Sequence, residues 1–181
     1  MIFKKTKLKD AVIIELEKNE DTRGFFARSW CEKEFADNGI NSVIKQCNIS
    51  YNSKKGTLRG MHYQVPPHEE EKLVRCIKGE IYDVIIDLRP QSPTYLKHLG
   101  ITLNEENRKM LFIPKGFAHG FQTMCDDTEV FYHMSAFYEP VAQRGIRWDD
   151  ANFAIQWPNV ENRIISEKDK QYSDFQHSRS R

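Results

Sequence analysis

Residues 72–88 read KLVRCIKGEIYDVIIDL, two apolar runs separated by the short turn Lys78-Gly79-Glu80. In the second run, every second residue from Tyr82 onward is apolar, whereas Asp83 and Asp87 lie at alternate positions. A period of two is typical of β-strands, because successive side chains point to opposite faces. Two such runs joined by a short glycine-containing turn predict a β-hairpin.

Further runs of β type occur along the chain, at residues 11–16, 99–103, 109–113 and 129–134. Ser166 and the acidic residues after it suit the start of a short helix near the C-terminus. Many closely spaced strands with few helices predict an all-β barrel or sandwich, with a mouth where polar groups can converge on a ligand. We expect one domain over residues 1–181, with a barrel core at about 10–140 and a helical C-terminal segment at about 160–181.

The composition argues against several classes of protein. Lysine and arginine number 27 against 26 aspartates and glutamates, and this net charge of +1 gives no reason to expect a nucleic-acid partner. No stretch approaches about 20 apolar residues, and the opening residues lack a signal peptide's apolar run. We therefore expect a soluble, cytoplasmic protein with no membrane partner. The cysteines show no CxxC or zinc-binding spacing, which favours free thiols; they are Cys31, Cys47, Cys76 and Cys125.

Polar residues with catalytic potential interrupt the apolar runs at His62, Lys72, His119, Tyr132 and Asp169. Taken singly, most have an ordinary structural explanation. His62 can be a packed or surface histidine, Tyr132 a core aromatic, and Asp169 part of a first helical turn. Lys72 can be an exposed countercharge to the glutamates before it. His119 stands out because small neighbours on both sides let a ligand approach the backbone.

Metal binding is the rival use for two histidines in a small barrel. Metal-binding barrels of the cupin type usually carry an H-x-H pair followed by a glutamate. Here the corresponding stretch is His62-Tyr63-Gln64, so the second ligand is missing. Two histidines without an identifiable third ligand make a poor zinc or iron site, and we expect no metal and no cofactor.

Several motifs occur in order along the chain: RGFF at 23–26, QCNIS at 46–50, LRGMHYQ at 58–64, DVIIDLR at 83–89 with SPT at 92–94, IPKGFAHGF at 113–121 and YEP at 138–140. Through these motifs the sequence resembles the dTDP-4-dehydrorhamnose 3,5-epimerase family, from about Phe3 to Asp169. The resemblance implies a cupin-like jelly-roll β-barrel with short C-terminal helices. It also implies a nucleotide-diphosphate sugar substrate, a homodimer formed by strand exchange, and catalysis without metal or nicotinamide. Family members supply L-sugars for surface polysaccharides or glycosylated natural products.

Carried over position by position, the resemblance assigns catalytic roles. His62 would be the general base, with Asp169 as its acidic partner, and Tyr132 would deliver a proton from the opposite face. Lys72 would stabilise the oxyanion at C4 of the sugar. The implied substrate-binding positions are Arg23, Phe26, Arg28, Gln46, Asn48, Arg59, His119, Tyr138 and Gln143.

These residue types suit proton transfer beside a ketone. A ketone at C4 acidifies the hydrogens at C3 and C5, because loss of either proton gives an enolate. Histidine titrates near neutral pH, so it can remove such a proton, and a lysine stabilises the charge that develops on the C4 oxygen. Arginines can hold the diphosphate through paired hydrogen bonds. The function expected is therefore epimerisation at C3, C5 or both in a 4-keto-6-deoxy sugar.

The sequence departs from the family pattern at two positions near the nucleotide. Arg28 replaces a glutamate of the R-G-F-F-x-E motif, and Gln143 replaces a glutamate after the Y-x-P motif. An arginine only donates hydrogen bonds, which favours a carbonyl-rich base and predicts a GDP- or CDP-linked sugar, hexose or heptose. The alternative is that Arg28 turns outward and thymine is held elsewhere.

Other functions remain open from the sequence. The same chemistry could invert only C3 or only C5, since small shifts of the acid or the sugar decide this. A barrel enzyme of other chemistry, such as a metal-dependent dioxygenase or a sugar isomerase, is a second possibility. A catalytically silent sugar-nucleotide-binding protein is a third, but it predicts loss of His62 or Tyr132, and both are present.

Overall fold

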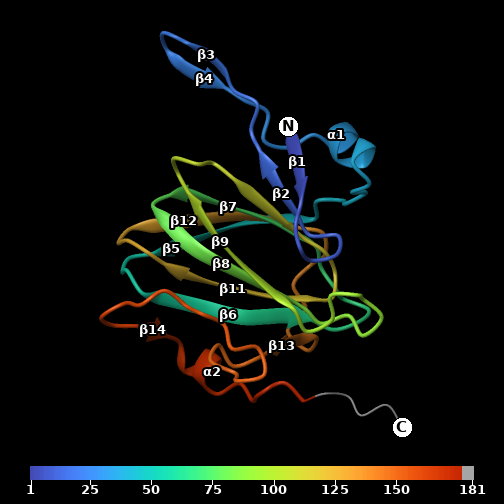
Figure 1. Ribbon diagram of the computed structural model, residues 1–181, viewed down its shortest axis with the longest axis vertical. Helices are drawn as coiled ribbons and strands as arrows, with labels where there is room; N and C mark the ends of the chain where they lie inside the picture. Colours follow the sequence, from blue (N-terminus) through green and yellow to red (C-terminus); the bar gives the residue numbers. More distant parts are fainter. Residues whose placement is uncertain (177–181) are drawn as a thin grey trace.

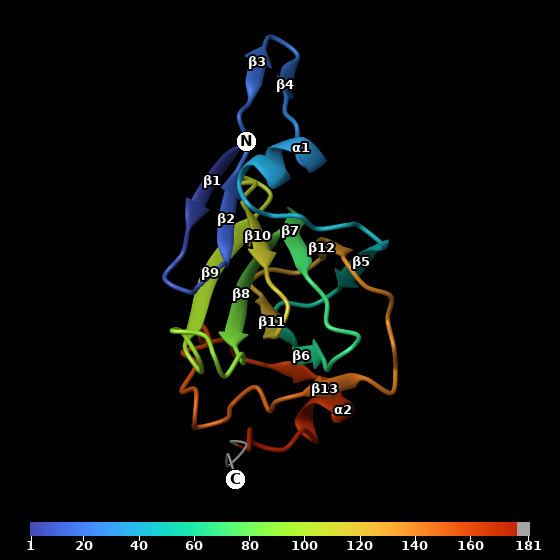
Figure 2. The same ribbon diagram turned by 90° about the vertical axis from the view of Figure 1, so that its right-hand side faces the viewer.

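The computed structural model describes residues 1–176, in which strands predominate (Figures 1 and 2). The elements are β1 (Ile2–Lys5), β2 (Val12–Glu15), β3 (Asn19–Asp21), β4 (Gly24–Phe26), α1 (Glu32–Asp37), β5 (Gln46–Asn52), β6 (Thr57–Gln64), β7 (Lys72–Lys78), β8 (Glu80–Asp87), β9 (His98–Asn104), β10 (Met110–Ile113), β11 (Phe117–Thr123), β12 (Thr128–Met134), β13 (Gln143–Gly145), β14 (Ile164–Ile165) and α2 (Glu167–Lys170).

Two antiparallel sheets form the body of the molecule. One has the strand order β1-β2-β10-β7-β12-β5, and the other has the order β13-β6-β11-β8-β9, with β14 added in parallel to β6. Apolar side chains from both sheets, such as Val74, Leu111, Ile85 and Phe121, pack into a shared core. This two-layered arrangement is the cupin-like jelly-roll barrel expected from the sequence, and the all-β prediction is confirmed.

The predicted hairpin at residues 72–88 is wrong, although both of its strands exist. β7 pairs with β10 and β12, whereas β8 pairs with β9 and β11 in the other sheet. The chain passes between the sheets at Gly79, where φ is +75°. A Cβ there would lie 2.7 Å from Thr128 Oγ1 and 2.8 Å from Cys125 Sγ, so the turn packs against another loop. Alternation identified the strand faces, but it does not specify which strands pair.

β8 is covered on both faces. Val84 and Ile86 pack under the C-terminal segment, in a cluster with Ile146 and Phe153. The polar side chains of Asp83 and Asp87 on the opposite face are fully buried as well. Buried carboxylates require hydrogen-bonding partners, and the strand therefore carries charged groups that belong to local networks.

The β3–β4 hairpin, which we call the arm, projects away from the sheets (Figure 1). Phe35 of α1 instead packs on the sheet that contains β10 and β7, against Leu73 and Phe112. At the other end, α2 lies beside β6 and β13 (Figures 1 and 2). None of the described helices is long and apolar enough to cross a membrane.

Candidate active site

A cavity of about 380 Å³ collects side chains from β5, β6, β7 and β12. It brings His62, Lys72 and Tyr132 together, although they lie on different strands. The lining residues are Gln46, Asn48, His62, Tyr63, Gln64, Glu70, Lys72, Tyr132, Met134, Tyr138 and Gln143.

His62 and Asp169 form a hydrogen-bonded pair, with His62 Nε2 2.8 Å from Asp169 Oδ1. The other carboxylate oxygen of Asp169 accepts from the Gly60 backbone N–H at 3.1 Å. Asp169 is positioned by α2, whose N-cap residue Ser166 accepts a hydrogen bond from the Asp169 backbone N–H. Burial alone would raise the pKa of Asp169, but the hydrogen bonds from His62, Gly60 and Ser166 together lower it. Asp169 is therefore an anion at neutral pH, and it fixes the ring of His62.

Because His62 Nε2 faces a carboxylate, this nitrogen carries the proton in the neutral ring. The other ring nitrogen, Nδ1, is then unprotonated and can accept a proton. The side chain of His62 keeps 30% of its accessible surface, whereas that of Asp169 keeps 6%. The base therefore reaches the cavity while its anionic partner lies behind it.

Lys72 lies on the cavity wall in an ion pair with Glu70, with Nζ 3.0 Å from Oε1. Both side chains are almost completely buried. Glu70 Oε2 also accepts from Gln64 Nε2 at 3.0 Å. The lysine is thus a charged group of the site and not an exposed countercharge. Glu70 is one of the glutamates that precede Lys72, but it was not predicted to belong to the site.

Tyr132 lines the cavity from β12. Burial raises its pKa above the ordinary tyrosine value; Arg59 acts in the opposite direction and Glu70 in the same direction. The phenol therefore stays protonated at neutral pH and can donate a proton. Arg59 itself is exposed, and its Nε donates to Asn52 Oδ1 at 2.7 Å. Arg59 is not among the residues that line the cavity.

The rim of the cavity is polar. Gln46 Oε1 accepts from the Tyr138 backbone N–H at 3.1 Å, and Gln46 Nε2 lies 3.5 Å from Asn48 Oδ1. Gln143 Oε1 accepts from Tyr138 Oη at 2.8 Å and from Lys168 Nζ at 2.6 Å. Lys168 was also missed from the sequence, although it directly precedes Asp169. These groups can bind a polar ligand at the entrance.

His119 is paired with His62 in the β11–β6 register, but it does not line the cavity. Its Nε2 lies 2.7 Å from Asp83 Oδ1, and both side chains are buried. No role was predicted for Asp83 from the sequence. The structure therefore contains a second His–Asp pair, one strand away from the first.

Two predicted binding residues of the arm, and Arg28 just after it, lie outside the cavity of their own chain. Arg23 forms an ion pair with Asp21 at 2.6 Å, and Phe26 is 72% exposed. Arg28 Nη1 donates to Glu34 Oε1 at 2.9 Å. The charge of Arg28 is thus met by an acid within the chain, as the outward-turned alternative expects.

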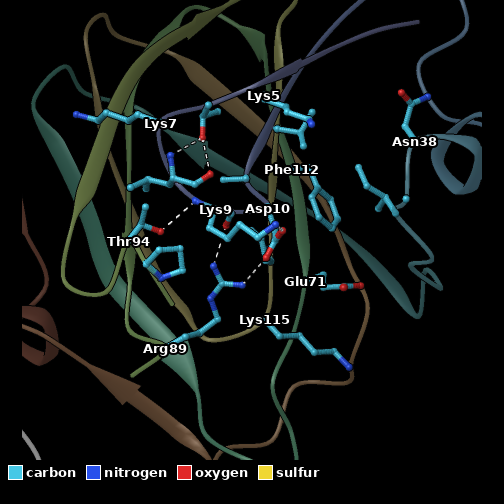
Figure 3. Close-up of a pocket in the computed structure, with 18 of the residues that line it drawn as sticks. Lys5, Lys7, Lys9, Asp10, Asn38, Glu71, Arg89, Thr94, Phe112 and Lys115 are labelled. Carbon is cyan, nitrogen blue, oxygen red and sulfur yellow. Dashed lines mark hydrogen bonds and ion pairs between the residues drawn. The ribbon is translucent and has the colours of Figure 1, made fainter. Parts of the chain in front are cut away.

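A larger cavity of about 710 Å³ lies between the β1–β2 loop and the segment after α1 (Figure 3). It holds none of the predicted catalytic residues. Its Arg89 is engaged by Asp10 at 2.9 Å and by Asp87 at 2.8 Å. Within residues 1–176, no group of three or more His, Cys, Asp or Glu side chains is arranged to hold a metal ion.

Comparisons with known proteins agree with this geometry. The family model described as dTDP-4-dehydrorhamnose 3,5-epimerase matches residues 5–177. A protein of that name from Shigella flexneri is 44% identical over 166 residues, 91% of each chain. The Bacillus anthracis epimerase, solved with TDP and pyrophosphate, has a TM-score of 0.91 at 38% identity and covers 94% of this chain and 97% of its own.

A third relative, from Legionella pneumophila, was solved in complex with dTDP-4-keto-L-rhamnose. Its TM-score is 0.90 at 36% identity, and the match covers 96% of this chain and 92% of that one. The family model spans β6, β7, β12 and α2, which carry the cavity and its His–Asp pair, and the Shigella relative matches 91% of the chain. This chain therefore belongs to the dTDP-4-dehydrorhamnose 3,5-epimerase family.

Proposed function

We propose that this chain epimerises a dTDP-linked 4-keto-6-deoxy sugar at both C3 and C5. The observation that carries the proposal is the convergence of a base, a cation and a phenol, His62, Lys72 and Tyr132, on one cavity. The Legionella relative bound to dTDP-4-keto-L-rhamnose supports the choice of nucleotide and sugar. The Arg28–Glu34 pair favours the alternative in which Arg28 turns away from the base.

The reaction begins when Nδ1 of His62 removes the proton from the carbon beside the ketone. The imidazolium that results is stabilised by Asp169, whose carboxylate lies 2.8 Å from Nε2. The electron pair moves to the C4 oxygen, where the ammonium of Lys72, which is almost completely buried, offsets the charge. Its existing pair with Glu70 holds the lysine in position before substrate arrives.

Inversion requires that the proton return on the face opposite the base. The phenol of Tyr132 is the donor in this proposal, because it lines the same cavity and its raised pKa keeps it protonated. The polar rim at Gln46, Asn48 and Tyr138 would hold the nucleotide part of the substrate.

We further propose that the working form is a homodimer in which the arm of one chain covers the cavity of its partner. Within one chain, Arg23 and Phe26 do not reach the cavity. The edge strand β5 also exposes apolar side chains, with Ile49 62% and Tyr51 53% exposed. Patches of this kind are typical of protein–protein contacts. A cytoplasmic location stays a prediction.

Solvent exchange tests the reaction directly. In deuterated buffer with a chelator, dTDP-4-keto-6-deoxyglucose should acquire deuterium at C3 and C5 and yield the inverted sugar, measured by NMR. GDP- and CDP-linked 4-keto sugars serve as the comparison. Exchange at one carbon alone would limit the enzyme to a single epimerisation. Activity that disappears with chelator and returns with a divalent metal would contradict the proposed mechanism.

A further inference from the structure

Tyr172 lies two residues after the end of α2 and beside His62, the proposed base. Its ring centroid is 5.9 Å from that of His62, and the two ring planes meet at 73°. This edge-to-face geometry is the favoured arrangement for two aromatic rings. The segment is held in place on its far side, because the Arg147 backbone N–H donates to Ser173 O at 3.3 Å.

Gly145 provides the space that this ring occupies. Gly145 is paired with His62 in the β13–β6 register. A Cβ built on Gly145 would lie 2.2 Å from Cε2 and 2.3 Å from Cζ of Tyr172. The φ of Gly145 is outside the left-handed range, so its backbone does not require glycine. The absence of a side chain at position 145 is therefore explained by the ring of Tyr172.

The hydroxyl of Tyr172 does not explain the position of this residue. Its Oη is buried and has no hydrogen-bond partner within residues 1–176. Burial, then the charge of Asp169 and the nearby Tyr138, raise the pKa of Tyr172, so the side chain stays neutral. The ring thus forms an uncharged wall beside the His62–Asp169 pair.

We propose that Tyr172 is a positioning residue, whose ring, seated over Gly145, fixes the imidazole of His62 between itself and the Asp169 carboxylate. Asp169 restrains Nε2 of His62 through a hydrogen bond. This single contact leaves the imidazole free to rotate about the axis of the hydrogen bond. The Tyr172 ring blocks that rotation from the side. The inference rests on the proposed role of His62 as the base, and it adds a residue that does not line the substrate cavity.

The test compares Tyr172→Ala, Tyr172→Phe and Gly145→Ala with the wild type. Tyr172→Ala should lower kcat by about 10- to 100-fold with little change in KM, because loss of base orientation affects the reaction more than binding. Tyr172→Phe should retain wild-type kcat, since only an unpaired hydroxyl is lost. Gly145→Ala should resemble Tyr172→Ala, because the added methyl group displaces the ring.

The double variant Gly145→Ala/Tyr172→Ala makes the test specific. Its kcat should be no lower than that of Tyr172→Ala alone, since the added methyl group then has room. Additive losses, or an unaltered kcat in Tyr172→Ala, would overturn the inference.

Melting temperatures and the His62 Cε1–H NMR signal are measured in parallel. That signal should move in Tyr172→Ala and Gly145→Ala but not in Tyr172→Phe, and an unmoved signal also overturns the inference. The NMR measurement needs no turnover, so it tests the position of His62 independently of the proposed reaction. The proposed reaction fails separately, if the wild type exchanges no substrate protons with solvent.

Discussion

Glu70 Oε1 lies 3.0 Å from Lys72 Nζ, and neither side chain keeps more than 10% of its accessible surface. The pair therefore has a structural role as well as the proposed catalytic one. Removal of one partner from a buried pair leaves an uncompensated charge, which is strongly destabilising. A single substitution of Lys72 would mix this loss with the loss of oxyanion stabilisation.

A pair of variants separates the two roles. Lys72→Met should lower the free energy of unfolding by about 3 kcal/mol, because Glu70 is left buried and unpaired. Lys72→Met/Glu70→Gln should recover most of this stability, yet it should remain almost inactive because no cation faces the C4 oxygen. Urea unfolding and the initial rate of epimerisation provide the measurements. An active double variant would remove Lys72 from the mechanism.

Tyr132→Phe should separate proton removal from inversion. His62 and Lys72 remain in place, so deuterium should still enter the substrate from the side of the base. The new proton cannot arrive from the opposite face, and exchange should therefore occur with retention at the affected carbon. NMR of the recovered sugar distinguishes retention from inversion. Epimerisation at the wild-type rate would contradict the two-face assignment.

Asp169→Asn should act through His62. An amide cannot stabilise the imidazolium as a carboxylate does, so the exchange rate should fall. His62→Ala removes the base itself and should lower the rate by about 10² to 10⁴. In the His62→Ala background, Asp169→Asn should cause little further loss, which is the signature of coupled residues. An equal loss in both backgrounds would mean that Asp169 contributes independently of His62.

Much of the strand pattern could be predicted from the sequence, because period-two alternation is a local property. β7, β8, β10 and β12 appear close to their expected bounds. Strand pairing is not local, and the passage of the chain between sheets at Gly79 depends on packing against the 125–128 loop. For this reason the hairpin was predicted and not observed.

Only part of the site could be predicted from the sequence, because contacts between strands are not a local property either. His62 lies in a family motif, whereas Lys72 and Tyr132 received their roles from the position-by-position resemblance. The fold brings all three into one cavity. Asp83 lies at an alternate position of its strand, and its partner His119 is 36 residues away on another strand, so the local pattern could not reveal the pair. Charged residues that face a barrel interior cannot be distinguished by pattern from those that face water.

Asp87 should make the fold sensitive to acid. Burial acts to raise its pKa, but hydrogen bonds from Arg89, Ser92 and Thr94 prevail and place the pKa below the ordinary value of 3.8. The folded state therefore favours the anion. The resulting stability is complete above the ordinary pKa and is lost as the pH falls through the lower, folded-state value. Asp87→Asn should reduce the difference in unfolding free energy between pH 7 and pH 3, measured in urea. Asp37→Asn, at an exposed helix position, is the control and should leave the difference intact.

The proposed exchange of arms between chains predicts complementation. Arg23→Ala should raise KM, because the arm would lose a cation for the diphosphate, whereas His62→Ala should lower the rate by about 10² to 10⁴. When the two variants are mixed and allowed to exchange subunits, each mixed dimer gains one site with an intact His62 and a partner arm that carries Arg23. If chains assort at random, activity at low substrate should approach about a quarter of the wild-type value.

Matched mixtures identify the source of any recovered activity. His62→Ala mixed with Tyr132→Phe should show no recovery, because the two residues line the same cavity of one chain and no mixed dimer has a complete site. Recovery in that control would indicate contamination or sharing of the core catalytic residues. If His62→Ala and Arg23→Ala also fail to complement, although native mass spectrometry shows mixed dimers, then the arm of one chain does not act in the site of its partner. In that case Arg23 would act within its own chain or not at all.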